Sequence, residues 1–443
     1  MAVPEGTWRN WAGTASAVPA RRARPRDVAD LARLVAQAGD LRVRAVGGGH
    51  SFTPAAVTDG LMLDLDAMAG VHDVVPQADG TTHVTLAAGT RLARVNSELA
   101  ARGLAMRNLG DIDHQSLAGA ISTGTHGTGA RLGGLATQVV GAQLVTATGE
   151  VLDVDATHEP ETFELARLGL GAVGVLSAVT LECVPAFRLE AREEPWALDA
   201  VLEGLDGPDG LVEGNDHFEF YWFPHTRRTL TKRNNRVADD VDAPLSPVRR
   251  WVEDEVLSNA LFAATNRIAT AFPAATPRIN ALASRALSPR RYTAPSAEVF
   301  ISPRRVRFRE MEYAVPRAAL PQVLAQIDRW IETQDARIPF PVEVRFAAAD
   351  DLWLSTAYGR ETAYVAVHQY VRLPHTRYFA AVERIVADVD GRPHWGKLHG
   401  LGADRLAQLY PRFDDARRVR AAADPRGRFA NDYLDRVLGP VRD

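Results

Sequence analysis

The chain has 443 residues, of which 46% are apolar, and its formal net charge at pH 7 is −4. This length predicts two or three lobes, and the apolar content is sufficient for each lobe to bury a core. The arginines are scattered and acidic residues outnumber basic ones, so the sequence excludes a protein whose main partner is nucleic acid.

A single cysteine, Cys183, stands in the apolar run 179–184. One cysteine excludes an intrachain disulfide and a cysteine-ligated cluster, and we expect Cys183 to be a small buried side chain. The first ten residues contain no apolar signal segment, and no stretch approaches the roughly 18 continuous apolar residues of a membrane span. We therefore expect a cytoplasmic protein without a membrane span; the number of subunits stays open.

The first 180 residues alternate irregularly between patterns typical of helices and of strands. Asp27 can cap a helix over 27–38, which Gly39 would end. A hairpin is predicted over 138–155, with its turn at Gly149. Alternation of this kind indicates an α+β fold. The other predicted elements are strands at 42–46, 61–65 and 84–87 and a helix over 91–102.

The chain changes character after Pro185, where acidic residues and prolines replace a clear apolar period as far as about Gly214. We place a domain boundary there. Residues 239–300 carry no recognisable motif, although a helix is expected near 251–272. Beyond them we predict strands of an antiparallel sheet at 342–346 and 363–371, covered by helices over 320–331 and 376–389.

One literal G-x-G-x-x-G occurs, at 169–174. A dinucleotide-binding motif of this type must follow a strand and open a helix, so that the helix N-terminus faces the pyrophosphate. Here a helix-like segment, 161–168, precedes the motif and a strand-like segment, 175–184, follows it. This order excludes a Rossmann-type fold.

Two other glycine loops predict an anion site. The first, residues 47–51, directly follows a strand, and its adjacent glycines let backbone N–H groups converge. The second, residues 124–129, mixes glycines with hydroxyl side chains that can donate to phosphate oxygens. Two such loops without a P-loop lysine indicate a pyrophosphate held by neutral donors, although each loop alone could be an ordinary tight turn.

Four side chains are candidates for chemistry. His50 ends the first loop; it is either a surface or capping histidine, or a neutral nucleophile beside a cofactor. Glu343 and Arg345 are two residues apart, which places them on one face of a strand, either as a solvated pair or as a polar site. Lys397 follows a tryptophan and a glycine, and is either an exposed turn residue or a cation aimed at a developing anion.

Taken in order, these segments resemble the aldonolactone and alditol oxidoreductases of the vanillyl-alcohol-oxidase superfamily. Residues 44–52 look like the loop to which those enzymes attach flavin, and 108–129 like their pyrophosphate-binding segment. Residues 343–345 and 394–397 look like their substrate-side signatures, and 424–434 like their C-terminal ending. The resemblance implies an FAD-binding domain of two subdomains (PCMH type) over 10–186, a cap domain with an antiparallel sheet flanked by helices over 187–400, and a return of 401–443 to the FAD-binding domain.

The resemblance also implies the chemistry, which is oxidation of a hydroxyl of a sugar lactone or polyol by hydride transfer to FAD bound covalently through His50. Arg345 and Lys397 would stabilise developing charge, Glu343 would hold substrate hydroxyls, and His368 is the candidate base. No metal is expected. Ser116 would contact the flavin, and the other expected contacts to FAD are Gly47, Gly48, Gly49, Ser51, Gly110, Gly119, Gly124, Thr125, His126, Gly127, Gly129, Gly174, Val175, His394 and Lys397.

The identity of the substrate and of the electron acceptor stays open. His368 and His399 depart from the polyol-oxidising pattern and favour a lactone, although each could equally be a core or capping histidine. Gly110 would leave a gap beside the flavin that admits dioxygen, which predicts release of hydrogen peroxide; alternatively it serves a turn that needs a positive φ. Another acceptor than dioxygen is the other possibility.

Three competing functions remain. The nearest is an alditol oxidase of the same family. A reductase with dissociable FAD is disfavoured by the histidine at the flavin-attachment position. A flavin-binding module without catalysis is disfavoured because the charged substrate-side residues are all present.

Overall fold

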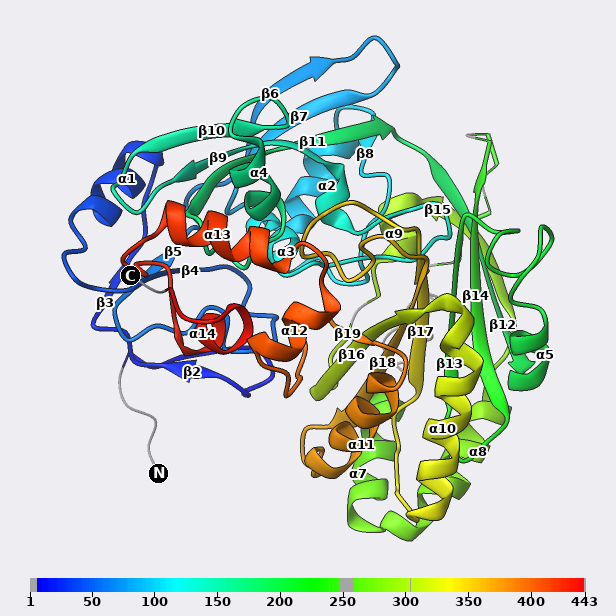
Figure 1. Ribbon diagram of the computed structural model, residues 1–443. Helices are drawn as coiled ribbons and strands as arrows, with labels where there is room; N and C mark the ends of the chain where they lie inside the picture. The colour runs from blue at the N-terminus through cyan, green and yellow to red at the C-terminus, as the bar shows by residue number, and fades with distance from the viewer. Residues whose placement is uncertain (1–5, 239, 242, 247–258, 303, 442–443) are drawn as a thin grey trace.

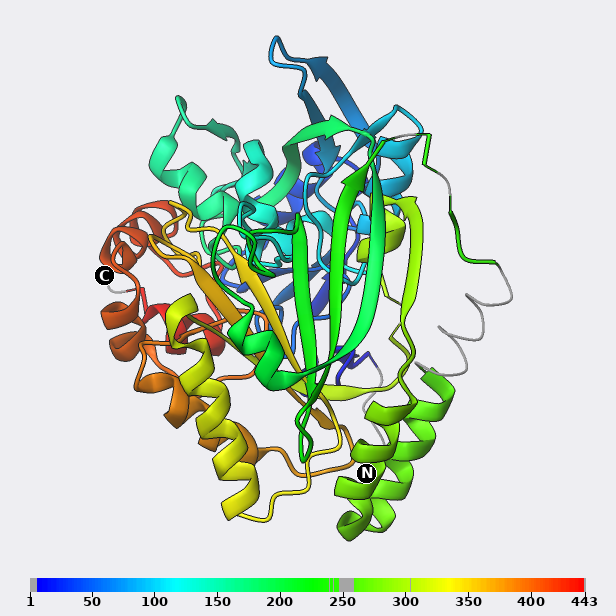
Figure 2. The same ribbon diagram turned by 90° about the vertical axis from the view of Figure 1, so that its right-hand side faces the viewer.

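The computed structural model describes residues 6–238, 240–241, 243–246, 259–302 and 304–441. Figures 1 and 2 show two small sheets with their helices, built from the first 185 residues, packed beside one large sheet built from the later part of the chain. The fold is α+β, as predicted. A short ribbon, β1 (Trp8–Arg9) with β2 (Ser16–Ala17), precedes both parts.

A three-stranded parallel sheet carries the first glycine loop. Its helix begins as predicted, because the carboxylate of Asp27 accepts a hydrogen bond from the backbone N–H of Asp30 at 2.8 Å. Leu31 and Val35 of that helix are buried against the sheet. The elements, in chain order, are β3 (Arg21–Ala23), α1 (Val28–Ala36), β4 (Val43–Val46) and β5 (Leu61–Asp64), and the sheet order is β3-β5-β4.

The second sheet is antiparallel and contains the predicted hairpin, whose turn holds Gly149 at φ +87°. The G-x-G-x-x-G stretch lies between α4 and β11, which confirms that it is not a Rossmann-type turn. The sheet order is β10-β9-β11-β7-β6, with β8 paired to β11. The strands are β6 (Val71–Pro76), β7 (Thr82–Ala87), β8 (Leu104–Ala105), β9 (Val139–Val145), β10 (Val151–Asp155) and β11 (Val175–Pro185), and the helices are α2 (Leu92–Ala100), α3 (Leu117–Ser122) and α4 (Pro160–Arg167).

The large sheet has eight strands, and all its pairs are antiparallel. Its order is β15-β12-β14-β13-β17-β18-β16-β19. Two of its strands and two covering helices were predicted. The strands are β12 (Arg188–Ala197), β13 (His217–Phe223), β14 (Arg228–Val237), β15 (Arg290–Pro295), β16 (Phe308–Pro316), β17 (Val342–Ala347), β18 (Thr362–Tyr370) and β19 (Arg392–Pro393), and the helices are α5 (Leu198–Glu203), α7 (Phe262–Ala271), α8 (Thr276–Ala286), α9 (Ser296–Phe300), α10 (Leu320–Thr333) and α11 (Thr376–Ala387).

The two faces of this large sheet differ sharply, because side chains alternate along each strand. On β17, Val342, Val344 and Phe346 pack into an apolar core with α10 and α11. Glu343 and Arg345 therefore point to the other face, which faces the loops of the first part of the chain. The same alternation on β16 places Glu310 and Glu312 on that face, since Met311 and Tyr313 lie in the apolar core.

Two segments differ in detail from what the sequence showed. The segment after Pro185, where no clear period was visible, contains a long strand, because β12 starts at Arg188 and pairs with β14 over its full length. Pro195 is tolerated because it lies beyond the end of β15, where β12 has β14 on one side only. Of the helix expected near 251–272, the structure describes α7, and residues 251–258 lie outside the described residues.

The last forty residues pack against the first part of the chain. The guanidinium of Arg44 on β4 donates to the backbone oxygen of Phe429 at 2.8 Å, and Phe429 lies in the core of the parallel sheet. Cys183 is buried, as predicted, and burial raises the pKa of its thiol to about 12. None of the helices that the structure describes is long and apolar enough to cross a bilayer. The helices here are α12 (Ala403–Leu409), α13 (Phe413–Ala423) and α14 (Asp432–Leu438).

Candidate active site

A cavity of about 650 Å³ lies between the charged face of the large sheet and the loops of the first part. Its wall includes Glu343, Arg345 and Lys397 from the sheet side and His50 from the first glycine loop. A narrower cavity of about 120 Å³ continues from it along the glycine loop. His50, Ser51, Gln115 and Thr123 line both cavities. Residues that are far apart in the sequence therefore meet at one elongated site.

The first glycine loop is packed too closely for side chains. A Cβ at Gly47 would lie 2.0 Å from Oγ of Ser116, and one at Gly48 would lie 2.5 Å from the backbone oxygen of His114. Ser116 caps α3 by accepting from the N–H of Gly119 at 3.2 Å, which leaves its hydroxyl hydrogen able to donate. The narrow cavity is also lined by the predicted residues Gly47, Gly48, Gly49, Ser51, Ser116, Gly119, Gly174 and Val175.

His50 is half-buried and lies between two aromatic rings. Its imidazole is stacked with Trp11 and with His114, with ring centroids 5.8 Å apart in both cases. Burial, together with the neighbouring His114 and Arg91, lowers the pKa of His50 to about 4. The ring is therefore neutral at physiological pH, as a nucleophile must be.

The second glycine loop contributes less to the site than predicted. Thr125 and His126 line the main cavity, but Gly124, Gly127 and Gly129 line neither of the two cavities. Close packing explains Gly127 and Gly129, where an added Cβ would lie 2.4 Å and 2.7 Å from its nearest neighbour, and a φ of +76° explains Gly124. Gly129 also donates its N–H to the backbone oxygen of Phe346 on β17, so the loop joins the two parts of the molecule.

Gly110 lines the main cavity, and its φ is not positive, so the alternative that it serves a positive-φ turn is wrong. A Cβ at this position would lie 3.1 Å from Cγ2 of Thr125 and 3.3 Å from the backbone oxygen of His126. Contacts of this length are tight, but small shifts of the neighbouring atoms would accommodate an alanine at this position. A methyl group there would project beside the cavity wall.

Arg345 is the centre of a buried ion network. Its guanidinium contacts Glu343, and it lies 2.9 Å from Glu219 and 3.2 Å from Asp111. Burial disfavours the charge, but the three carboxylates outweigh it and hold the pKa of Arg345 well above its ordinary value. Arg304 joins the network through Asp111 and through Glu343 at 3.2 Å. The pair predicted on one strand face is thus buried and not solvated.

Lys397 pairs with Glu310, with 2.5 Å between Nζ and Oε2. Burial opposes the charge of the ammonium group, but Glu310 and Glu312 outweigh this and raise the pKa of Lys397. Burial likewise opposes the charge of Glu310, and Lys397 outweighs it and lowers the pKa of that carboxyl to about 2. Both groups are charged at neutral pH. Lys397 is therefore a hydrogen-bond donor in the cavity wall and not an exposed turn residue.

His368 and His399 do not line the main cavity. His368 lies behind the carboxylates, with Nε2 at 3.5 Å from Glu310 and 3.9 Å from Glu343. It is 4% exposed, and its role as the base stays a prediction. His399 is buried against α14, with its Nε2 at 3.2 Å from the hydroxyl of Tyr433.

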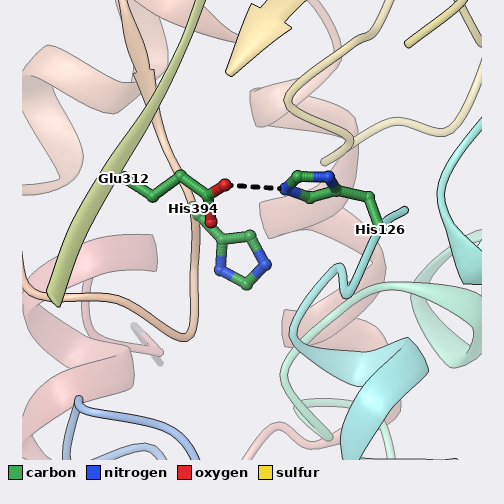
Figure 3. A group of neighbouring side chains, drawn as sticks. All are labelled: His126, Glu312 and His394. Carbon is green, nitrogen blue, oxygen red and sulfur yellow. Dashed lines mark ion pairs between the residues drawn. The ribbon is translucent and has the colours of Figure 1, made fainter. Parts of the chain in front are cut away.

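His126, Glu312 and His394 converge in the cavity wall, and their possible ligand atoms lie within 4.8 Å of one another (Figure 3). Nδ1 of His126 donates to the backbone oxygen of Gly127 at 2.9 Å, and its Nε2 lies 3.1 Å from Glu312. Nδ1 of His394 accepts the N–H of Gly396 at 3.0 Å, and burial lowers the pKa of this ring to about 3. The neutral His394 therefore carries its proton on Nε2, while its Nδ1 accepts the N–H of Gly396.

Several residues of the site were missed in the sequence. Glu310 and Glu312 show the same two-residue spacing as the recognised pair on β17. The rarity of lysine is a second signal for these site residues. Of the 51 basic residues, lysines and arginines together, only Lys232 and Lys397 are lysines. Both are in this network, because Nζ of Lys232 lies 3.2 Å from Glu219. The other missed members are Glu219, Asp111 and Arg304.

Comparison with known proteins identifies the family. A family model described as D-arabinono-1,4-lactone oxidase matches residues 179–437, and one described as FAD binding domain matches residues 19–155. The chain belongs to the D-arabinono-1,4-lactone oxidase family. It is an FAD-dependent oxidoreductase, and the family resemblance stated from the motifs is confirmed.

Full-length relatives agree with this assignment. The chain is 42% identical to an L-gulono-1,4-lactone dehydrogenase of Mycobacterium tuberculosis, covering 98% of this chain and 99% of the relative. It is 33% identical to an L-gulonolactone oxidase of Scyliorhinus torazame, covering 97% and 98%. A structure described as a solvent-stable cholesterol oxidase has the same fold, with a TM-score of 0.80 at 18% identity over 98% of this chain and 97% of that one.

The residues present fit FAD. The narrow cavity is lined by glycines of the first loop, where side chains would fill the space, and it leads directly into the larger one. Oε1 of Gln115 is buried without a hydrogen-bond partner, and Gln115 lines both cavities, so a bound group with a donor would satisfy it. His50 stands where the two cavities join.

Proposed function

We propose that this family member oxidises a hydroxyl of an aldono-1,4-lactone, such as L-gulono- or D-arabinono-1,4-lactone, with an FAD bonded to His50. The observation that carries the proposal is the meeting of Arg345, Lys397 and Glu343 with His50 in one cavity. The names of the full-length relatives support a lactone as substrate. We further propose that residues 10–186 and 401–443 form the FAD-binding domain and that 187–400 form the cap.

Bound FAD supplies a hydride acceptor, N5 of its isoalloxazine ring. The residues of the wall would stabilise the negative charge that develops on the substrate oxygen as its hydroxyl loses a proton. Lys397 and Arg345 are two of the cations that line the wall, and because both are held by buried carboxylates they need no reorganisation during the reaction. Lys397 donates a hydrogen bond to the reacting oxygen. It is not the base, because its raised pKa keeps it protonated.

Glu343 holds substrate hydroxyls and fixes Arg345. The carboxylate is 4% exposed and contacts Arg345, Arg304 and the hydroxyl of Tyr221. A carboxylate tied to two guanidinium groups has a fixed orientation and accepts hydrogen bonds from sugar hydroxyls in one geometry. This arrangement suits a small polar substrate with several hydroxyl groups.

The attachment to His50 rests on its neutral ring and on its place between the cavities. A neutral imidazole nitrogen can form the bond to the 8α-methyl group of the flavin, and His50 is neutral at physiological pH because its pKa is about 4. Arg91 and Lys397 contribute to lowering that pKa.

Gly110 bears on the choice of electron acceptor, because it lines the cavity and has no side chain to fill the space beside the flavin. We propose that the gap at Gly110 admits dioxygen, so that the enzyme releases hydrogen peroxide. Gly110→Ala should lower peroxide release in air while reduction of an artificial dye persists, because a methyl group narrows the approach and leaves the substrate side unchanged. If the wild-type enzyme reduces the dye but does not react with oxygen, it is a dehydrogenase, and the proposed role of Gly110 is wrong.

The substrate class is tested by turnover with dye on a panel of sugar lactones and alditols. We expect the lactones to be oxidised with the higher kcat/KM. Higher kcat/KM with alditols would favour the alternative, an alditol oxidase. A bound flavin that no lactone or alditol reduces would favour a flavin-binding module without catalysis.

A further inference from the structure

The helices α7 and α8 bury polar side chains and expose apolar ones, the reverse of the usual pattern. They lie together at the lower edge of the molecule in Figures 1 and 2. Nδ2 of Asn280 donates to the backbone oxygens of Pro224 at 3.0 Å and Ile338 at 2.9 Å. The polar side chains at the buried positions, each at most 3% exposed, are Asn266, Thr276, Asn280 and Ser284.

The outer face of the same hairpin is apolar. Leu261 and Ile268 are each 51% exposed, Phe272 is 68% exposed and Leu282 is 72% exposed. Positions 261, 268 and 272 are seven and four residues apart, so they form one stripe along α7 and its ends. Four of the nine exposed large hydrophobic residues among the described ones gather on this hairpin. A gathered apolar patch of this kind is typical of a surface that contacts another protein or a membrane.

The charge of the hairpin indicates what it binds. Residues 259–286 contain three arginines and no acidic residue, in a chain whose net charge is −4. Arg267, Arg278 and Arg285 are exposed, and none of them forms an ion pair with another described residue. Phenylalanine, leucine and isoleucine flanked by unpaired arginines are typical of helices that lie in the interface of an anionic membrane.

We propose that the α7–α8 hairpin docks this protein peripherally on membranes that contain anionic lipids. The exposed apolar side chains would enter the headgroup region, while the long arginine side chains reach the phosphates. The active-site cavity lies close to this surface: Phe262 of α7 packs edge-on against Phe340 at 4.7 Å, in the same cluster as Phe308 of the cavity wall. The hairpin contributes no residue to the cavity, so the proposal is independent of the substrate.

The test is sedimentation of the purified flavoprotein with vesicles of phosphatidylcholine, with and without phosphatidylglycerol. We expect binding to the anionic vesicles at low salt and loss of binding at high salt, because screening removes the contribution of the arginines. Phe272→Ser combined with Leu282→Ser should lower binding by about tenfold, since two inserted apolar side chains are lost. Arg278→Glu combined with Arg285→Glu should abolish the preference for anionic vesicles.

Val18→Ser is the matched control, because Val18 is 56% exposed and lies in the segment after β2, outside the hairpin. It should bind as the wild type does, and all variants should keep turnover, since the substituted residues are on the surface. Wild-type protein that ignores anionic vesicles overturns the proposal, as does equal binding by the Phe272 and Leu282 variant. A dimer that this variant converts to monomer, without vesicle binding, would instead identify a second copy of the chain as the partner.

Discussion

Replacing Lys397 by alanine should slow anaerobic reduction of the flavin by substrate by about a hundredfold or more, the scale of removing one preorganised donor to a developing oxyanion. Lys397 is the ammonium group of the cavity wall, and it is held by Glu310 at 2.5 Å. Stopped-flow measurement of flavin bleaching, at saturating substrate and without oxygen, isolates this step from reoxidation.

The control addresses stability, because Lys397→Ala alone leaves the buried Glu310 without its cation. Removal of one partner of a buried pair is strongly destabilising, whereas removal of both charges is not. The double variant Lys397→Ala with Glu310→Gln should therefore regain thermal stability and still reduce the flavin slowly. Reduction at the wild-type rate in the double variant would remove Lys397 from the mechanism.

Replacement of Arg345 should also slow flavin reduction, and here the shape of the side chain matters as well as its charge. Its planar guanidinium group contacts Glu343, Glu219 and Asp111 at once, and the compact ammonium group of a lysine cannot reach all three carboxylates. Arg345→Lys keeps the charge and should still reduce the flavin more slowly than wild type. A wild-type rate in this variant would show that only the charge at this position matters.

Replacing His50 by alanine should give folded protein that binds FAD without a covalent bond. After acid precipitation, the yellow colour should stay in the supernatant for His50→Ala and in the pellet for the wild type. Turnover should also fall, because the covalent bond fixes the position and tunes the potential of the flavin.

His114→Ala is the matched control, since the two imidazoles are stacked at 5.8 Å and both line the main cavity. This variant should keep its flavin in the pellet. If His50→Ala retains covalent flavin and His114→Ala loses it, the attachment lies on His114 and our assignment is wrong.

The parts that local sequence determines were predictable. The cap at Asp27 and the turn at Gly149 depend on neighbours in the chain, and both formed as expected. Glu343 and Arg345 share a face because strands alternate, which spacing alone reveals. The glycine loop after β4 was recognisable from its adjacent glycines. The structure explains why Gly47 is a glycine, because close packing against Ser116 leaves no room for a side chain there.

The parts that depend on tertiary register were not predictable. Arg345 stands opposite Glu219 across β13 and β17, and no local pattern announces that pairing. Strand β12 was hidden because its outward residues are charged, and partners on β14 such as Arg233, which pairs with Glu194, compensate them. In the second glycine loop, Gly127 packs closely against Asn108 and Leu109, and Gly129 packs against Asp216 of the other part of the molecule. Composition alone cannot distinguish such packing from ligand binding.

Anaerobic titration of the purified protein with L-gulono-1,4-lactone and D-arabinono-1,4-lactone, followed by acid precipitation, tests whether a covalently bound flavin oxidises a lactone. We predict that at least one lactone bleaches the flavin absorbance and that the flavin remains with the pelleted protein. A flavin that neither lactone bleaches, in protein whose flavin an artificial reductant does bleach, would contradict the proposed function.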